Sequence, residues 1–133
     1  MKPPSRTARG AGAERAARRH LESRGLRTLA TNYRWRGGEL DLVMHDGAEL
    51  VIVEVRYRRD ASQVHPFDTV TAAKQRRILR ATERLLQQES ALSRLPVRFD
   101  VVAVSGPLDA PEVQWLRGCF DSTGVAPGWR QRL

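Results

Sequence analysis

The stretch GELDLVMHDGAELVIVEVRYRR, residues 38–59, has the pattern of a β-hairpin. Asp46-Gly47 is the strongest short-range hairpin signal, and runs of Leu, Val and Ile flank it on both sides. Four charged residues nevertheless lie inside the two strands: Glu39, Asp41, Glu54 and Arg56. Because side chains alternate along a strand, we expect all four to share one face of a sheet.

The register of this hairpin decides how close the acids lie. A tight turn at Asp46-Gly47 would set Glu39 opposite Glu54 and make Asp41 and Glu54 diagonal neighbours, with backbones roughly 7–8 Å apart. A longer loop would instead set Asp41 directly opposite Glu54. Both registers keep the charges on one face, because they differ by an even number of residues.

Neighbouring carboxylates repel each other, so the cluster needs a partner charge. One solution is a divalent cation, since clustered carboxylate oxygens suit Mg²⁺ or Mn²⁺ and these ions also accept substrate phosphate. The other solution is ion pairing with Arg56 or Arg58 on a solvated face. The spacing of the residues leaves both solutions open.

The rest of the chain predicts an α/β domain with a mixed central sheet flanked by helices, in the order α-β-β-β-α-β. The predicted elements are a helix in GAERAARRHLESRG, a strand over 26–35, the hairpin, a helix over 71–89, a buried strand over 97–104 and an edge strand in EVQWL. We expect a flexible basic tail over residues 1–11, the domain over 12–120 and a loosely ordered tail over 121–133. Asp100 is expected to pair with Arg98 or to support the site structurally.

Charge points to the class of partner. The 133 residues carry a formal net charge of +8, which makes nucleic acid the leading partner class and an anionic membrane surface the second. Only Lys2 and Lys74 among the 23 basic residues are lysines. The lone Cys119 excludes an internal disulfide and a cysteine zinc site, which suits a cytoplasmic protein. Neither a signal peptide nor an apolar run of roughly 18 residues is visible.

Several stretches together resemble a known family: GAERAARRHLESRG, NYRWRGGELDLV, LVIVEVRYRR, DTVTAAKQRRI and RFDVVAV. An acid, a hairpin and then E-x-K on the next strand are the signature of the PD-(D/E)XK nuclease superfamily, which includes restriction enzymes and Holliday junction resolvases. The chain resembles most closely the YraN-type family of uncharacterised bacterial proteins, which are expected to be nuclease-like. The resemblance implies a restriction-endonuclease-like fold.

The resemblance also implies an activity and a set of site residues. The activity is Mg²⁺- or Mn²⁺-dependent hydrolysis of DNA phosphodiester bonds, selective for branched, flapped or single-stranded DNA and without a small-molecule cofactor. Asp41 and Glu54 match the two metal-binding acids, to which the Val55 carbonyl would add a ligand. Glu14 matches an acid of the N-terminal helix that joins the metal site in resolvase-like members. Glu39 and Gln75 match family positions of uncertain role.

Arg56 departs from the superfamily pattern, because it stands where lysine is usual. Arginine is always charged and cannot act as a base, but it could stabilise negative charge that develops on phosphate. Lys74 borders the apolar stripe of the second predicted helix. It either reaches the site as a catalytic residue or packs its stem along the core.

A rim of positive charge around an acidic centre suits a phosphodiesterase, since the rim can hold the phosphate backbone. The expected DNA-binding residues are Arg15, Arg18, Arg19, Arg34, Trp35, Arg36, Arg58, Arg59, Arg76, Arg77, Arg80 and Arg84. Tyr33 and Trp35 could stack on bases or pack in the core.

Two other functions compete with the nuclease. One is a non-catalytic DNA- or RNA-binding protein with a degenerate nuclease site, which Arg56 favours. The other is a protein-interaction adaptor whose charge is incidental. Within the nuclease interpretation, cutting of a symmetric junction would by analogy favour a two-fold homodimer.

Overall fold

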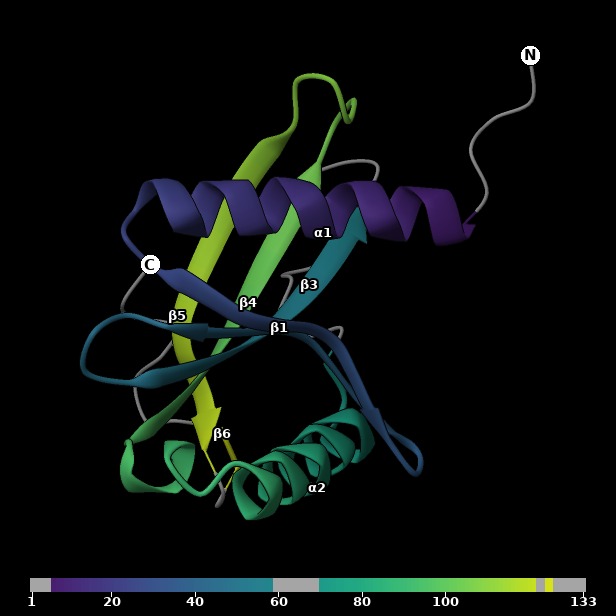
Figure 1. Ribbon diagram of the computed structural model, residues 1–133. Helices are drawn as coiled ribbons and strands as arrows, with labels where there is room; N and C mark the ends of the chain where they lie inside the picture. Colours follow the sequence, from purple (N-terminus) through teal and green to yellow (C-terminus); the bar gives the residue numbers. More distant parts are fainter. Residues whose placement is uncertain (1–5, 59–69, 122–123, 126–133) are drawn as a thin grey trace.

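The computed structural model describes residues 6–58, 70–121 and 124–125. Two α-helices cover the two faces of a six-stranded sheet (Figure 1). The elements in chain order are α1 (Arg6–Ser23), β1 (Arg27–Trp35), β2 (Gly38–His45), β3 (Leu50–Arg58), α2 (Ala72–Gln88), the short 3-10 helix η2 (Leu92–Arg94), β4 (Val97–Ser105), β5 (Glu112–Asp121) and β6 (Gly124–Val125). This confirms the predicted order and the mixed α/β architecture.

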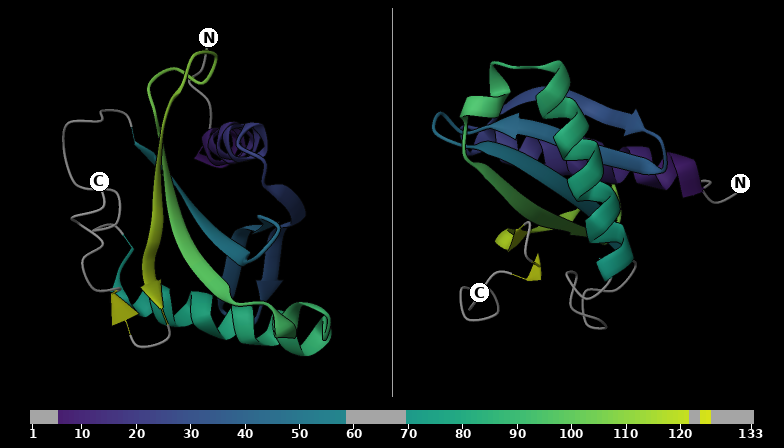
Figure 2. Two further views of the ribbon diagram at one scale, coloured as in Figure 1. Left: turned by 90° about the vertical axis from the view of Figure 1, so that its left-hand side faces the viewer. Right: turned by 90° about the horizontal axis from the view of Figure 1, so that it is seen from below.

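The strands lie in the sheet in the order in which they occur in the chain. β3 and β4 run parallel, and every other pair of neighbours is antiparallel. A parallel pair needs a crossover connection, and α2 lies within the segment that provides it. The two further views show α1 and α2 on opposite sides of the twisted sheet (Figure 2).

Each helix covers its own hydrophobic layer. On one face Ala13, Ala17 and Leu21 of α1 pack against the odd-numbered valines of β3 and the valines Val102 and Val104 of β4. On the other face a larger cluster joins Ile78, Ala81 and Leu85 of α2 to the sheet. Because side chains alternate along β3, this one strand contributes residues to both hydrophobic layers, as its sequence pattern predicts.

A buried charge network fixes the sheet at the end of the hairpin. Asp100 is fully buried and receives two hydrogen bonds from Arg98, at 3.0 Å each, and one each from the indole of Trp115 and the backbone N–H of Gly118. Arg98 also contacts Asp46 and Glu49 beyond β2 and before β3. The predicted pairing of Asp100 with Arg98 is therefore confirmed, and it ties β4 to β5 and to the hairpin loop.

The hairpin loop differs from the tight turn. His45 pairs with Leu50, so residues 46–49 form a wider loop. The Asp46 carboxylate accepts hydrogen bonds from the backbone N–H groups of Ala48 and Glu49, at 3.0 and 2.7 Å, and these bonds close the loop. The tight-turn register is wrong, and the longer-loop alternative is the one that occurs.

Element ends differ from the predictions in two further places. Helix α1 begins at Arg6, inside the segment expected to be a tail, in a stretch rich in the helix formers Arg and Ala. β5 extends beyond EVQWL to Asp121 and is not an edge strand, because β6 pairs with it. Arg59, the loop over 60–68 and most of the expected C-terminal tail lie outside the described residues. In the part of the chain that the structure describes, no helix has the length and apolar character needed to cross a membrane.

Candidate active site

The site lies where β2 and β3 separate. Their ladder pairing ends at Leu42 and Val53, and β3 continues to Arg58 without β2 (Figure 1). The Asp41 carboxylate takes over as acceptor there, because the backbone N–H of Val55 donates to its Oδ2 at 2.8 Å. One further step of the same register sets Asp41 opposite Glu54. The sequence predicted that these two acids share a face, and the observed register makes them direct neighbours.

Glu54 is a buried acid with two cationic neighbours. Its side chain is 4% exposed, and its Oε1 lies 2.7 Å from the Lys74 ammonium and 3.6 Å from the Arg56 guanidinium. Lys74 reaches this position from α2, whereas Arg56 lies two residues further along β3 itself. The hypothesis that Lys74 approaches the acids is therefore confirmed as a contact, and its catalytic role remains a prediction.

The second acid, Asp41, binds its proton unusually tightly. Burial is the largest cause and the negative charge of Glu54 is the next, and together they raise the pKa of Asp41 to about 8. The hydrogen bond from the Val55 N–H works in the opposite direction, and the charge of Glu14 adds a small further increase. Near neutral pH the pair therefore holds a proton that two isolated carboxylates would have released.

Glu14 approaches this pair from the other face of the sheet without joining it. Its side chain hydrogen-bonds Asn32, and burial raises its pKa, with smaller increases from the charges of Glu39 and Glu54. Among the described residues, no three His, Cys, Asp or Glu side chains come together closely enough to hold a metal ion. The acids that meet are Asp41 and Glu54, so Glu14 as a metal ligand remains a prediction.

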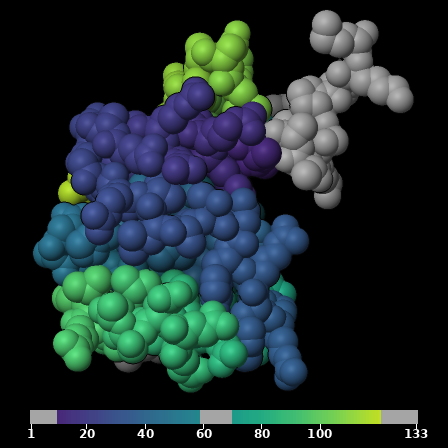
Figure 3. Space-filling model, viewed as in Figure 1, coloured from purple at the N-terminus to yellow at the C-terminus, as the bar shows by residue number. Residues whose placement is uncertain are grey.

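The acid pair opens into a pocket with a volume of about 450 cubic ångströms between the β1–β2 turn and α2. Its lining comes from three places in the chain: residues 34–39, which comprise the β1–β2 turn and the adjoining strand ends, the acids Asp41 and Glu54, and Lys74, Arg77 and Ile78 of α2. The space-filling view shows the turn (blue) projecting beside α2 (green) (Figure 3).

Gly38 allows the turn to lie this close to α2. A Cβ atom at this position would be 2.7 Å from the carbonyl oxygen of Arg77 and 3.1 Å from the Cβ of Ala81. Any side chain would therefore push the turn away from the helix. Gly38 thus also sets the width of the pocket.

The donor set fits a divalent cation of the Mg²⁺ type. Two carboxylates face each other, and burial followed by their mutual repulsion raises the pKa of Asp41. A bound cation would relieve that repulsion. The N–H and C=O of one strand residue point to the same edge, so the Val55 carbonyl lies on the side of Asp41. Mg²⁺ commonly takes one or two protein carboxylates and completes its shell with water and substrate phosphate, so a third acid is not required.

The structure divides the predicted basic rim into separate groups. Arg34, Trp35, Arg36 and Arg77 line the pocket of the acid pair. Arg15 and Arg18 line a smaller pocket beside Glu14 and Asn32, and Arg15 and Arg19 line a third one, against the β4–β5 connection. Arg76 and Arg80 are exposed on α2, Arg84 is half-buried there, and Arg58 hydrogen-bonds Gln114.

Two predicted positions of uncertain role now have neighbours. Glu39 lines the pocket and forms an exposed ion pair with Arg34, at 3.5 Å. The Gln75 amide donates to the backbone carbonyl of Val70 at 3.0 Å, which fixes the start of α2 rather than the acid pair.

Asn32 is a hydrogen-bond partner of Glu14 that the sequence did not indicate. It has a positive φ of 52°, the left-handed region that few residues other than Gly and Asn adopt, and its side chain bonds Glu14. An asparagine within an otherwise strand-forming run was the available signal. Its role could not be assigned without the position of α1.

Fold and site together define an α/β protein with a paired-acid pocket where β2 and β3 of a mixed sheet separate. The model of the Uncharacterised protein family UPF0102 matches residues 13–104. A UPF0102 protein of Xanthomonas campestris pv. campestris (strain B100) is 49% identical over 118 residues, 89% of this chain and 95% of that protein. One from Nitrosococcus oceani is 41% identical over 120 residues, 90% of this chain and 97% of that protein. The chain belongs to UPF0102, which confirms the predicted membership of an uncharacterised bacterial family.

Proposed function

We propose that this protein is a divalent-metal-dependent endonuclease that hydrolyses DNA phosphodiester bonds, with a restriction-endonuclease-like fold of the PD-(D/E)XK type. The observation that carries the proposal is the meeting of Asp41 and Glu54 in a pocket whose rim is basic. A buried carboxylate next to a half-buried one is costly for folding, so a function that uses their shared charge explains their position.

The proposed roles follow from the donor set. Asp41, Glu54 and the Val55 carbonyl would hold Mg²⁺ or Mn²⁺, with Glu14 as a further ligand directly or through water. When bound, the cation supplies activation of a water molecule and polarisation of the scissile phosphate. No covalent protein intermediate is needed, which agrees with the absence of a nucleophile-elbow motif from the sequence.

Lys74 is the residue we propose in place of the superfamily lysine. Its ammonium lies 2.7 Å from Glu54 Oε1, closer than the Arg56 guanidinium at 3.6 Å. A compact ammonium at this position can stabilise negative charge on a phosphate next to the acids. Arg56 would assist from β3.

A second candidate function has its own support. Because Lys74 and Arg56 both contact Glu54, the acid pair already has cationic partners without a metal. That arrangement favours a non-catalytic nucleic-acid-binding protein with a degenerate nuclease site.

Cleavage assays separate these two functions. Purified protein would be incubated with labelled duplex, single-stranded, flapped and four-way-junction DNA, plus RNA of matched sequence, with Mg²⁺, Mn²⁺ or EDTA. Glu54→Gln and Asp41→Asn remove the acids with little change of shape, and Glu83→Gln, an exposed acid on α2, is the matched control.

We expect metal-dependent cutting of DNA by the wild type and by Glu83→Gln, and its loss in both acid-pair variants. Binding without cutting under all metal conditions would overturn the nuclease proposal in favour of the second candidate. Equal cutting by the acid-pair variants would overturn the site assignment.

A further inference from the structure

We infer that the pocket accepts an unpaired strand of DNA, with one base stacked on Trp35, and that an intact duplex cannot reach the acid pair. This inference names the substrate class of the proposed nuclease and rests on that function.

Glu54 lies too deep for a duplex surface, and Asp41 beside it is half-buried. The Glu54 side chain is 4% exposed, and the pocket that it lines has a volume of about 450 cubic ångströms. That volume is within the range of pockets that hold a single small ligand. Duplex DNA is a stiff rod, with a persistence length of about 50 nm, and its stacked bases hold the phosphates on the outside of that rod. A flexible single strand can instead bend its backbone into the pocket.

The wall of the pocket is held in place. Trp35 and Gly38 are the last ladder pair of β1 and β2, so the turn is closed by sheet pairing. Gly38 in turn rests directly on the backbone of α2 at Arg77. A wall fixed at both contacts resists widening, so the protein would have to select a narrow substrate.

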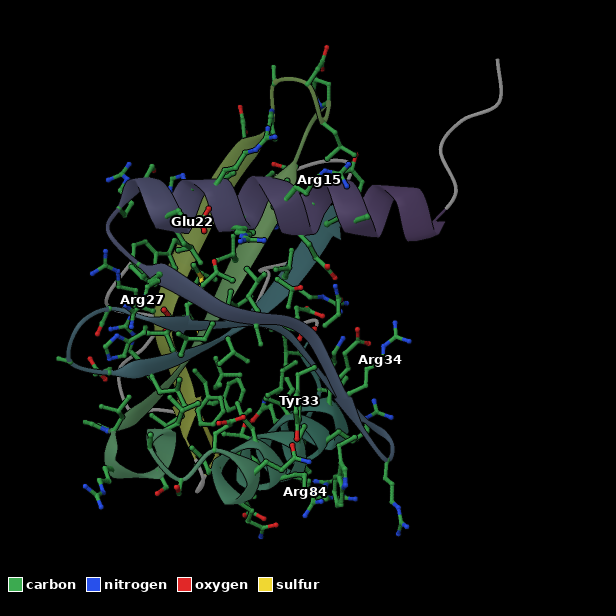
Figure 4. All side chains as sticks on the ribbon, in the orientation of Figure 1. Arg15, Glu22, Arg27, Tyr33, Arg34 and Arg84 are labelled. Atoms are coloured by element: carbon green, nitrogen blue, oxygen red, sulfur yellow. The ribbon has the colours of Figure 1, made fainter. Side chains whose placement is uncertain are left out.

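The two aromatic residues of β1 have different environments. Tyr33 packs against the α2-side core and its hydroxyl donates to the Gln88 side chain, which makes it a core residue (Figure 4). Trp35 is half-buried and lines the pocket. An indole on the wall of a pocket offers a flat surface for a base, and such stacking tolerates any base sequence.

Arginines stand on both sides of the entrance. Arg34 lies at the end of β1 and Arg36 in the β1–β2 turn, whereas Arg77 belongs to α2. The Arg34 side chain is 77% exposed, and its ion pair with Glu39 is exposed as well. Because exposed ion pairs contribute little free energy, Arg34 can leave Glu39 and contact a phosphate at small cost. A strand entering between turn and helix would therefore meet positive charge on each side of the acids.

Binding in EDTA tests this inference without requiring any cutting. Fluorescence anisotropy would compare a labelled 12-nucleotide oligo(dT) with a blunt duplex of 12 base pairs. The variants are Trp35→Ala, Trp35→Phe and Arg34→Ala, and the matched control is Arg27→Ala, at the opposite end of the same strand (Figure 4). Thermal unfolding of each variant checks that it is folded. If Trp35→Ala does not fold, Arg34→Ala provides the test.

We expect the wild type to bind the single strand more tightly than the duplex. Trp35→Ala should weaken that binding roughly 5- to 100-fold, with a smaller loss in Trp35→Phe, which keeps a ring. Arg34→Ala should weaken it and Arg27→Ala should not. Equal affinity for duplex, or unchanged single-strand binding in both Trp35→Ala and Arg34→Ala, would overturn the inference.

Failure of this inference and failure of the catalytic proposal give different results. Trp35-dependent single-strand binding by a protein that never cuts would refute the nuclease and keep Trp35 as a binding residue for an unpaired strand. Metal-dependent cutting of intact duplex that Trp35→Ala leaves unchanged would do the reverse.

Discussion

At the residue scale, Asp41 has two opposing roles. Its carboxylate completes the strand pairing by accepting the Val55 N–H, and its charge repels that of Glu54. An asparagine at this position would keep the acceptor oxygen and remove the charge. The two roles can therefore be separated by a single substitution.

The first prediction concerns the pH dependence of stability. Because the pKa of Asp41 is raised from 3.8 to about 8, the folded protein keeps a proton that the unfolded chain releases between those values. The free energy of unfolding should therefore fall as pH rises through this window. Asp41→Asn replaces the titrating carboxyl group with an amide that stays neutral. The variant should therefore be more stable than the wild type at pH 8 by on the order of 1 kcal/mol. Urea denaturation at pH 5 and pH 8 measures the difference, and parallel pH profiles of both proteins would contradict the account.

The second prediction ranks the two cations at Glu54. Lys74→Ala removes the nearer charge and should lower the cleavage rate roughly 10²- to 10³-fold, the usual effect of losing one group that stabilises developing negative charge. Arg56→Ala removes the guanidinium that lies 3.6 Å from Glu54 Oε1, and it should lower the cleavage rate less. Arg76→Ala removes an exposed charge from the same helix and serves as the control. Single-turnover cleavage at saturating Mg²⁺ gives the three rates, and a larger loss in Arg56→Ala would reverse the assignment.

The sequence could identify the acids, and it named Lys74 and Arg56 as candidate partners without deciding between the alternatives for either. Alternation along the strands was enough to put Asp41 and Glu54 on one face, because that period is local. The contact of Lys74 with Glu54 depends on how α2 crosses the sheet, and the bond of Asn32 to Glu14 depends on how α1 does. Both are tertiary facts, which no local pattern near these residues contains.

At the scale of elements, the contact between the β1–β2 turn and α2 shapes the pocket. The third prediction is that Gly38→Ala destabilises the protein by about 1–3 kcal/mol, because its Cβ would be 2.7 Å from the Arg77 carbonyl oxygen. Gly10→Ala is the control, since it lies in α1 with nothing within 4 Å and should stabilise by about 0.5–1 kcal/mol. Urea denaturation of both variants checks this, and a neutral Gly38→Ala would mean that the turn is not pressed against α2.

The hairpin shows how far local signals extend. Asp46-Gly47 correctly located the loop, and Gly47 has the positive φ of 97° that such a position favours. The register was not determined by this dipeptide, because the Asp46 carboxylate bonds two backbone N–H groups and Arg98 holds Asp46 and Glu49 from β4. A contact from a distant strand thus selected the register that sets Asp41 opposite Glu54.

At the scale of the whole molecule, the net charge of +8 predicts strongly salt-dependent binding of nucleic acid. The fourth prediction is that Arg36→Gln reduces the slope of log K against log salt concentration for single-stranded DNA by about 0.7, one phosphate contact. Arg94→Gln, an exposed arginine of η2 beyond the other end of α2, should leave the slope unchanged. Anisotropy titrations between 50 and 300 mM NaCl would measure both slopes, and equal reductions would indicate that the charge acts diffusely rather than through the pocket.

The central claim is that Asp41 and Glu54 together hold a divalent cation. Isothermal titration of the DNA-free protein with Mn²⁺ tests it most directly, with Asp41→Asn and Glu54→Gln beside the wild type and Glu83→Gln as the control. The account predicts one site in the wild type and in Glu83→Gln, and its loss in both acid-pair variants. Uptake of Mn²⁺ by the acid-pair variants with wild-type affinity, or no uptake by the wild type, would contradict it.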